Sequence, residues 1–181
     1  GSVTDGEVTM TNGAVINAGS GLVNVAAAGD VTIGSLTKTG DVQVATTAGA
    51  IVDGGDTDVD VVAAMAQLLA FTGIGTDAND LDTTVTTVAG STGTGDINLT
   101  DTDALEVGTV NGTVGLTLTG GGTVGDDNIT LSATAGALLV SNAISNGDGG
   151  NITLLNTGAA ADVTISANVT VTDGDAVIDG D

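Results

Sequence analysis

The chain has 181 residues, one cation (Lys38), a formal net charge of −22 and 41% hydrophobic residues, and it lacks Cys, His, Pro, Trp and Tyr. This charge repels phosphate and anionic lipid, which excludes a nucleic-acid binder, and no apolar run reaches the roughly 20 residues of a membrane span. The hydrophobic content is too high for an acidic disordered segment, and the absence of His and Cys excludes nucleophile–His catalysis.

Short runs of β-branched and aliphatic residues recur along the chain, separated by Gly, Asp, Asn and Thr, which is typical of strands joined by turns. The expected strands are Glu7–Met10, Ala14–Ile16, Leu22–Val25, Val31–Ile33, Val42–Val44, Ile51–Val52, Val85–Val88, Ile97–Leu99, Leu105–Val107, Val114–Leu118, Ile129–Leu131, Leu138–Val140, Ile152–Leu155, Val163–Ile165, Val169–Val171 and Ala176–Ile178. The stretch Val59–Phe71 contains good helix formers. It predicts either a surface helix or two strands split at Ala63–Ala64, and the number of coils favours strand.

One unit, G-[D/N]-[V/I]-x-[V/I/L], begins at Gly29, Gly40, Gly95 and Gly150. Glycine provides a positive φ at a corner, and Asp or Asn hydrogen-bonds the turning backbone. The two branched residues point to one side of the strand and the residue between them to the other.

The spacing of similar short sequence motifs indicates a repeat. A-A-G-D-V-T-I and A-A-A-D-V-T-I place Asp30 and Asp162 at an offset of 162 − 30 = 132, and a second pair of phrases gives 128 − 41 = 87. The shorter offset 151 − 128 = 23 joins two strands directly. A period of about 22 residues reconciles these offsets as six, four and one repeats, which is typical of a solenoid.

We therefore predict an all-β fold, a parallel β-helix with coils of about 22 residues, as one domain over residues 1–181. A β-sandwich would need longer strands and two-residue hairpin loops. The side chains expected to point inward are Val31, Ile33, Ile97, Leu99, Ile129, Leu131, Ile152, Leu154, Val163 and Ile165. Those expected to point outward are Thr32, Asn98, Thr130, Thr153 and Thr164.

Three phrases carry a family resemblance: T-T-A-G-A-I-V-D-G from Thr46, the long run from Thr72 to Gly112, and G-G-N-I-T-L from Gly149. They resemble repeat regions of filamentous-haemagglutinin-like and β-strand-repeat adhesins of bacterial surfaces. The resemblance implies a right-handed β-helix, export, and a role as stalk, fibre or adhesive shaft. It carries over no catalytic residues.

Two acidic regions are candidates for metal binding, because oxygen-rich loops suit Ca²⁺. The candidate ligands are Asp53, Asp56, Asp58, Asp60, Asp173, Asp175, Asp179 and Asp181. The spacing fails as an EF-hand, since Val61 stands where glycine is needed. The alternative is that these aspartates cap turns and keep the rod soluble. No cofactor is required on either interpretation, and Ca²⁺ is the candidate ligand.

The expected function is a non-enzymatic structural segment of an extracellular bacterial fibre or adhesin, part of a longer surface protein. Its terminal strands read like interior strands, so we expect adjacent repeats or a second copy to stack on them head to tail, forming a filament. Glycans and a neighbouring cell surface are further candidate partners. Two other functions stay open: a β-helical glycan-processing enzyme with a pair of acids, and a Ca²⁺-binding surface-layer or biofilm matrix protein.

Overall fold

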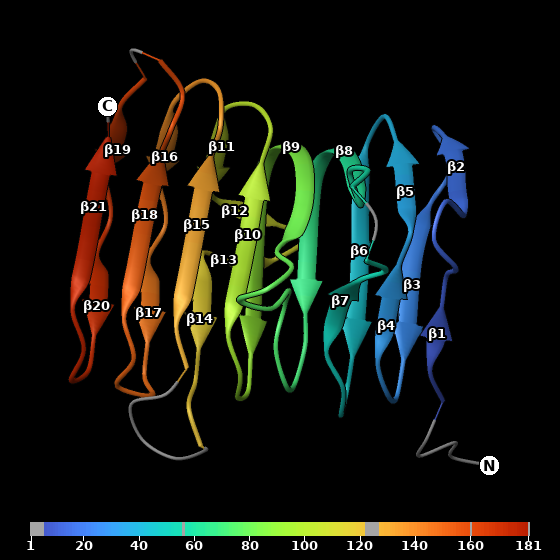
Figure 1. Ribbon diagram of the computed structural model, residues 1–181, viewed down its shortest axis with the longest axis horizontal. Coiled ribbons are helices and arrows are strands. Elements are labelled where there is room, and N and C mark those ends of the chain that lie inside the picture. Colours follow the sequence, from blue (N-terminus) through green and yellow to red (C-terminus); the bar gives the residue numbers. More distant parts are fainter. Residues whose placement is uncertain (1–5, 56, 122–126, 160, 181) are drawn as a thin grey trace.

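The fold consists of strands and turns. In the computed structural model, residues 6–55, 57–121, 127–159 and 161–180 are described, and none of these residues is helical. The strands lie side by side along the longest axis of the molecule, and the two chain ends lie at opposite ends of that axis (Figure 1). The all-β prediction is therefore confirmed.

The strands follow one another in successive turns of the chain. The first four turns contain β1 (Val8–Thr9), β2 (Val15–Gly19) and β3 (Val23–Ala27); β4 (Val31–Ile33), β5 (Ser35–Lys38) and β6 (Asp41–Thr46); β7 (Ile51–Asp53) and β8 (Val61–Leu69); and β9 (Leu81–Thr92). The later turns contain β10 (Ile97–Asp101), β11 (Leu105–Val107) and β14 (Leu116–Leu118); β15 (Ile129–Ala133), β16 (Leu138–Val140) and β17 (Ile144–Asn146); β18 (Ile152–Asn156), β19 (Val163–Ile165) and β20 (Val169–Val171); and finally β21 (Ala176–Gly180).

Successive turns pair in parallel, and their registers measure the repeat. The residues aligned at the start of each turn are Val8, Val31, Ile51, Ile74, Ile97, Ile129, Ile152 and Ala176. Subtraction gives turns of 23, 20, 23, 23, 32, 23 and 24 residues, so the expected period of about 22 is confirmed except in one longer turn. This pairing is consistent with a β-helix.

Strand β8 crosses a corner without a break. Its first residues, Val61 and Val62, pair with β5, whereas Met65 to Leu69 pair with β6. The pairing partner changes at Ala63–Ala64, but the strand itself is unbroken there, so the expected division into two strands was wrong. The prediction of strand rather than helix for Val59–Phe71 is confirmed. Strand β9 likewise pairs along its length with β10, β11 and β14.

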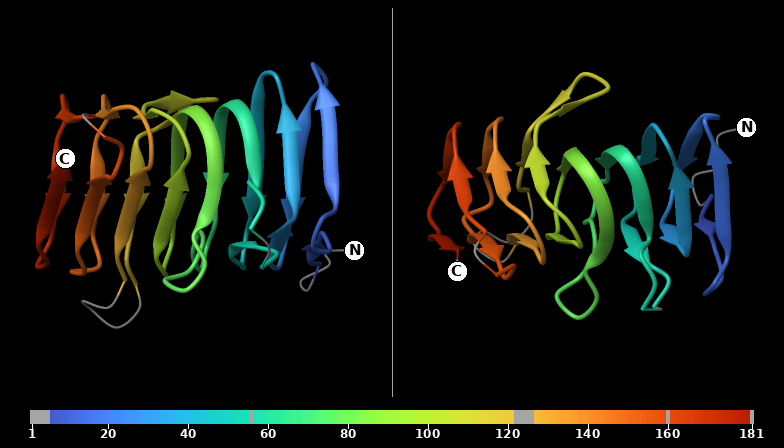
Figure 2. Two further views of the ribbon diagram at one scale, coloured as in Figure 1. Left: turned by 45° about the horizontal axis from the view of Figure 1, so that its top comes forward. Right: turned by 90° about the horizontal axis from the view of Figure 1, so that it is seen from above.

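The 32-residue turn contains an antiparallel hairpin, formed by β12 (Thr109–Val110) and β13 (Thr113–Val114). Asn111 and Gly112 form its two-residue loop, with φ values of 50° and 87°. Figure 2 shows this hairpin projecting from the stack. The expected strand Val114–Leu118 was therefore wrong at its start: the chain bends at Gly115, where β13 ends and β14 has yet to begin.

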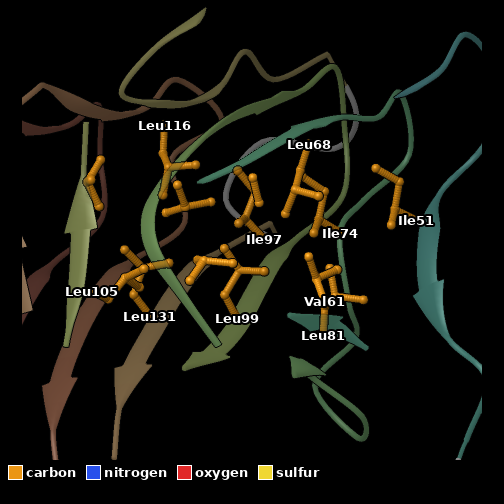
Figure 3. Close-up of a cluster of buried hydrophobic side chains, with 14 of the residues drawn as sticks. Ile51, Val61, Leu68, Ile74, Leu81, Ile97, Leu99, Leu105, Leu116 and Leu131 are labelled. Atoms are coloured by element: carbon orange, nitrogen blue, oxygen red, sulfur yellow. The ribbon is translucent and has the colours of Figure 1, made fainter. Parts of the chain in front are cut away.

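The core is aliphatic, as expected from a chain with one aromatic residue. Side chains such as Ile97, Leu99 and Leu68 point toward one another between the sheets (Figure 3) and are at most 1% exposed. Phe71 lies outside the core and is 49% exposed. Nearest-neighbour turns thus bury one continuous strip of Val, Ile, Leu and Ala.

Most of the expected side-chain directions are confirmed. Eight of the ten residues expected inside are buried: Val31, Ile33, Ile97, Leu99, Ile129, Leu131, Ile152 and Leu154. Val163 is half-buried and Ile165 is 39% exposed, because β19 pairs with β16 alone among the described strands. Asn98, expected outside, is 2% exposed, because its side-chain amide donates to the Asp77 carboxylate at 3.2 Å.

The long offsets in the sequence do not join equivalent positions. Val31 lies on β4, the first strand of its turn, whereas Val163 lies on β19, the second strand of a later turn. Asp41 and Asn128 also lie at different places around the turn, because Asp41 begins β6 and Asn128 precedes β15. Interpreting 132 and 87 as whole numbers of repeats was therefore wrong, whereas the offset of 23 from Asn128 to Asn151 is one turn. The same short sequence motif forms strands at different positions around the turn.

Candidate functional site

Buried Asp and Asn side chains close the corners of the stack. Asp53, Asp101, Asn146 and Asn156 each end a strand, and one side-chain oxygen of each accepts the backbone N–H two residues later at 2.8–3.0 Å. All four are at most 9% exposed. Because Asn and Asp accept the same backbone hydrogen bond here, this role requires an oxygen acceptor rather than a charge.

A second group of Asp and Asn residues joins one turn to the next. The side-chain oxygen of Asp30 accepts a hydrogen bond from the N–H of Ala50. In the same way Asp96 accepts from the N–H of Asn128, and Asn128 accepts from the N–H of Asn151, all at 2.6–2.9 Å. Asn151 continues the series with the N–H of Asp175 at 2.8 Å. The Asp or Asn of the repeated unit was expected to bond its own turn, but it bonds the following turn instead. We call this series the side-chain ladder.

The glycines beside the ladder are needed mainly for space. A Cβ on Gly150 would lie 2.0 Å from the Asp127 carbonyl oxygen, and one on Gly174 would lie 2.2 Å from that of Gly150. A positive φ was expected at these corners, and Gly95 has it at 76°. The close approach of the preceding turn is the reason that Gly150 and Gly174 share.

The metal candidates lie in two separate regions. Asp53 and Asp60 are buried; Asp53 bonds the N–H of Gly55 at 2.8 Å, and Asp60 bonds that of Asp82 at 2.9 Å. Asp58 is exposed, as are three carboxylates near the other end of the stack, Asp173, Asp175 and Asp179. Asp56 and Asp181 lie outside the described residues. Among the residues that are described, no three acidic side chains gather as a metal site would require.

Two carboxyl groups have a raised pKa. For Asp101 the main cause is burial, opposed by hydrogen bonds from the Thr83 hydroxyl and the N–H groups of Val85 and Asp103. For Asp96 the main cause is also burial, opposed by its bond from Asn128 and reinforced by the negative charges of Asp77 and Asp127. A raised pKa means that the folded chain binds the proton more tightly than the unfolded chain does, so stability falls as the pH rises through it.

We expect Asp96→Asn to raise the melting temperature at pH 7. Asparagine occupies the same ladder position at Asn128 and Asn151, so it keeps the acceptor and removes the partly buried charge. The gain should shrink as the pH is lowered through the raised pKa of Asp96, because the wild-type carboxyl then also becomes neutral in the folded chain. Asp30→Asn is the control, because Asp30 has the same role but is exposed. An equal gain in both variants, or a gain that does not depend on pH, would contradict this account.

Two small surface cavities contain few acids. One, of about 300 Å³, lies at the N-terminal end between Gly6, Glu7, Val8 and Ala26–Ala28. The other, of about 190 Å³, is lined by Thr86, Ala104, Leu105, Glu106, Ala137 and Leu139. Each cavity is lined by one carboxylate, whereas glycoside hydrolysis uses two.

The two ends of the stack are the most distinctive surfaces. In the part of the chain that is described, β1, β2 and β3 pair with β4, β5 and β6 alone, and β19, β20 and β21 pair with β16, β17 and β18 alone. Most of the exposed large apolar residues lie at these ends, whereas Phe71 and Val114 lie elsewhere. Those at the ends are Val15, Ile16 and Leu22 at one, and Ile165, Val177 and Ile178 at the other. Open strand edges with apolar side chains are sites for further strand pairing.

No known protein family, curated protein or solved structure matches this chain. The described residues also contain no helix with the length and apolarity needed to cross a bilayer.

Proposed function

We propose that the chain is a right-handed parallel β-helix whose function is structural: it forms a non-enzymatic segment of an extracellular bacterial fibre or adhesin and stacks into an extended filament. The observation that carries this proposal is the continuous parallel stack of turns around an aliphatic core. The handedness rests on the steric preference of parallel crossovers and on the sequence resemblance to surface adhesins. Adjacent repeats or further copies cover the ends, and the acidic sides face solvent.

The cell surface fits the chemistry of the chain. A net charge of −22 keeps a rod soluble and limits sideways association. Glycans or a neighbouring cell surface are the candidate partners of the exposed sides.

Light scattering and electron microscopy of the 181-residue protein test the filament. We expect particles that lengthen with protein concentration at moderate ionic strength, because salt screens the repulsion between acidic copies. Monodisperse single rods at all concentrations would contradict the proposal. Absence of turnover on neutral and acidic polysaccharides is the matching expectation for a non-enzyme, and turnover abolished by one Asp→Asn change would overturn it.

A Ca²⁺-binding surface-layer or matrix protein is the second candidate, favoured by the exposed Asp173, Asp175 and Asp179 near one open end. We expect Ca²⁺ to raise the melting temperature at low ionic strength and to promote association, because it offsets the repulsion between carboxylates. Thermal melts with Ca²⁺, with Mg²⁺ and with chelator measure this. A melting temperature unaffected by Ca²⁺ would leave the aspartates as solvated charges and corner caps.

A further inference from the structure

A small apolar groove lies on the side of the stack, across three successive turns that contain β9, β11 and β16. It has a volume of about 190 Å³ and is lined by Thr86, Ala104, Leu105, Glu106, Ala137 and Leu139. We propose that this groove is a docking site for a lysine side chain of a basic partner protein. The inference goes beyond the proposed structural function, because it assigns a partner to the side of the stack and does not depend on the filament.

The groove is apolar at a position where comparable strands are polar. The middle residue of β16 is Leu139, whereas the middle residues of β14, β19 and β20 are Thr117, Thr164 and Thr170. Leu139 lies between two buried residues of its strand, so it points outward, and it is half-buried. An aliphatic side chain on the outer face is therefore a particular feature of this side of the stack.

Small residues at two neighbouring corners keep the groove open. Ala104 and Ala137 stand immediately before β11 and β16, and both are exposed. Gly136 lies so close to Ala104 that an added Cβ would be 2.7 Å from the Ala104 Cβ. Leu105, which is 1% exposed, lies beneath them. The lining carbons thus form a surface for a straight aliphatic chain.

Glu106 places one negative charge beside these carbons. It is half-buried and pairs in register with Leu139, so its side chain points outward next to the aliphatic one. Lysine buries its aliphatic stem along apolar surface and keeps its ammonium group near water. A lysine stem that lies against Leu105 and Leu139 brings its ammonium group to the Glu106 carboxylate at the rim.

Charge and size exclude other occupants. A net charge of −22 repels anionic ligands such as fatty acids. Small-molecule sites usually have about 300–1,000 Å³, so this smaller groove suits a single side chain. The guanidinium of arginine carries several N–H donors, whereas the lining side chains offer oxygen acceptors only at Glu106 and Thr86.

The cation must come from outside these 181 residues. Their one Lys or Arg is Lys38, on β5, and its Nζ donates to the Asp41 carbonyl oxygen at 2.6 Å. A second copy offers the same engaged lysine. Charge complementarity therefore favours a separate protein with exposed lysines, which the field of the acidic stack attracts.

NMR titration with an end-blocked Gly-Lys-Gly peptide tests the site, at about 0.15 M salt to screen long-range attraction. We expect saturable shifts of the Leu105 and Leu139 methyl signals and none at Leu68 in the core. Diaminobutyrate in place of lysine shortens the stem by two methylene groups and should weaken binding about five- to tenfold. Norleucine removes the charge and should weaken binding about two- to fivefold. Equal binding of either comparison peptide would overturn the assignment to lysine.

Two pairs of variants locate the contact. Ala137→Leu fills the groove and should abolish the shifts, whereas Ala48→Leu, at another exposed corner alanine, should not. Glu106→Gln should weaken the lysine peptide about two- to fivefold, whereas Asp103→Asn removes a charge from an exposed residue outside the lining and should have no effect. Unchanged methyl signals elsewhere show that each variant is folded.

Equal weakening by Glu106→Gln and Asp103→Asn would show that the peptide responds to the general field of the stack, which would overturn the site. A wild-type protein without saturable shifts at Leu105 and Leu139 would overturn it as well. Both results leave the filament untouched, because these measurements do not depend on association between copies.

Discussion

Replacing Gly95 by alanine is expected to destabilise the fold by about 2 to 5 kcal/mol, which is a large part of the stability of an ordinary domain. Gly95 has a φ of 76°, which costs an L-residue about 1–2 kcal/mol. Its Cβ would also lie 1.9 Å from the Thr72 carbonyl oxygen, so the backbone of two turns must separate. Forced separation of this kind costs about a further 1–3 kcal/mol.

Gly112→Ala is the matched control, because Gly112 has a φ of 87° but no atom within 4 Å of the added Cβ. We expect it to cost about 1–2 kcal/mol, the conformational part alone. Urea unfolding followed by circular dichroism measures both variants. Equal losses would show that the turns do not approach closely at Gly95, and that glycine is present there for its φ only.

The second large effect is expected in the core. Leu68 lies on β8, is fully buried and packs within the single aliphatic cluster of the stack (Figure 3). Leu68→Ala should cost about 2–5 kcal/mol, because it removes apolar contacts and leaves a cavity. Since each turn contacts only its neighbours, hydrogen exchange should increase most in the turns that contain β6, β8 and β9.

Leu22→Ala is the control for this prediction, because the same side-chain atoms are removed from a residue that is 76% exposed. We expect a change within about 0.5 kcal/mol, measured at a protein concentration low enough to keep the chain monomeric. A comparable loss in both variants would mean that the interior is loosely packed. Uniform exchange along the whole chain after Leu68→Ala would show that the stack unfolds as one cooperative unit.

The candidate site was only partly accessible from the sequence. The open ends were expected, because the first and last strands read like interior strands without Pro or Lys. The role of Asp53 as a corner cap was one of two interpretations left open, and its bond to Gly55 shows that role directly. The ladder was missed as a contact between turns, because Asp30 and Ala50 meet only once the turns stack.

Local chemistry explains what could be determined from the sequence alone. Alternating branched residues, turn residues and a period near 22 establish strands, their inward side chains and the turn length, because each depends on neighbours within about one turn of the chain. The number of coils likewise favoured strand over helix for Val59–Phe71, although not the single unbroken strand β8 that the structure has. A charge of −22 likewise limits the partners without any knowledge of the fold.

The tertiary structure was needed wherever the answer depends on which turn lies beside which. The turn that contains the hairpin at Asn111–Gly112 has 32 residues, so counting repeats along the sequence loses the register of the later strands. Asn98 is buried because a loop brings Asp77 against it, and Ile165 is exposed because no further turn covers β19 among the described residues. The similar sequences of β4 and β19 favour the same local strand conformation. Only the stacking of the turns places these two strands at different positions around the turn.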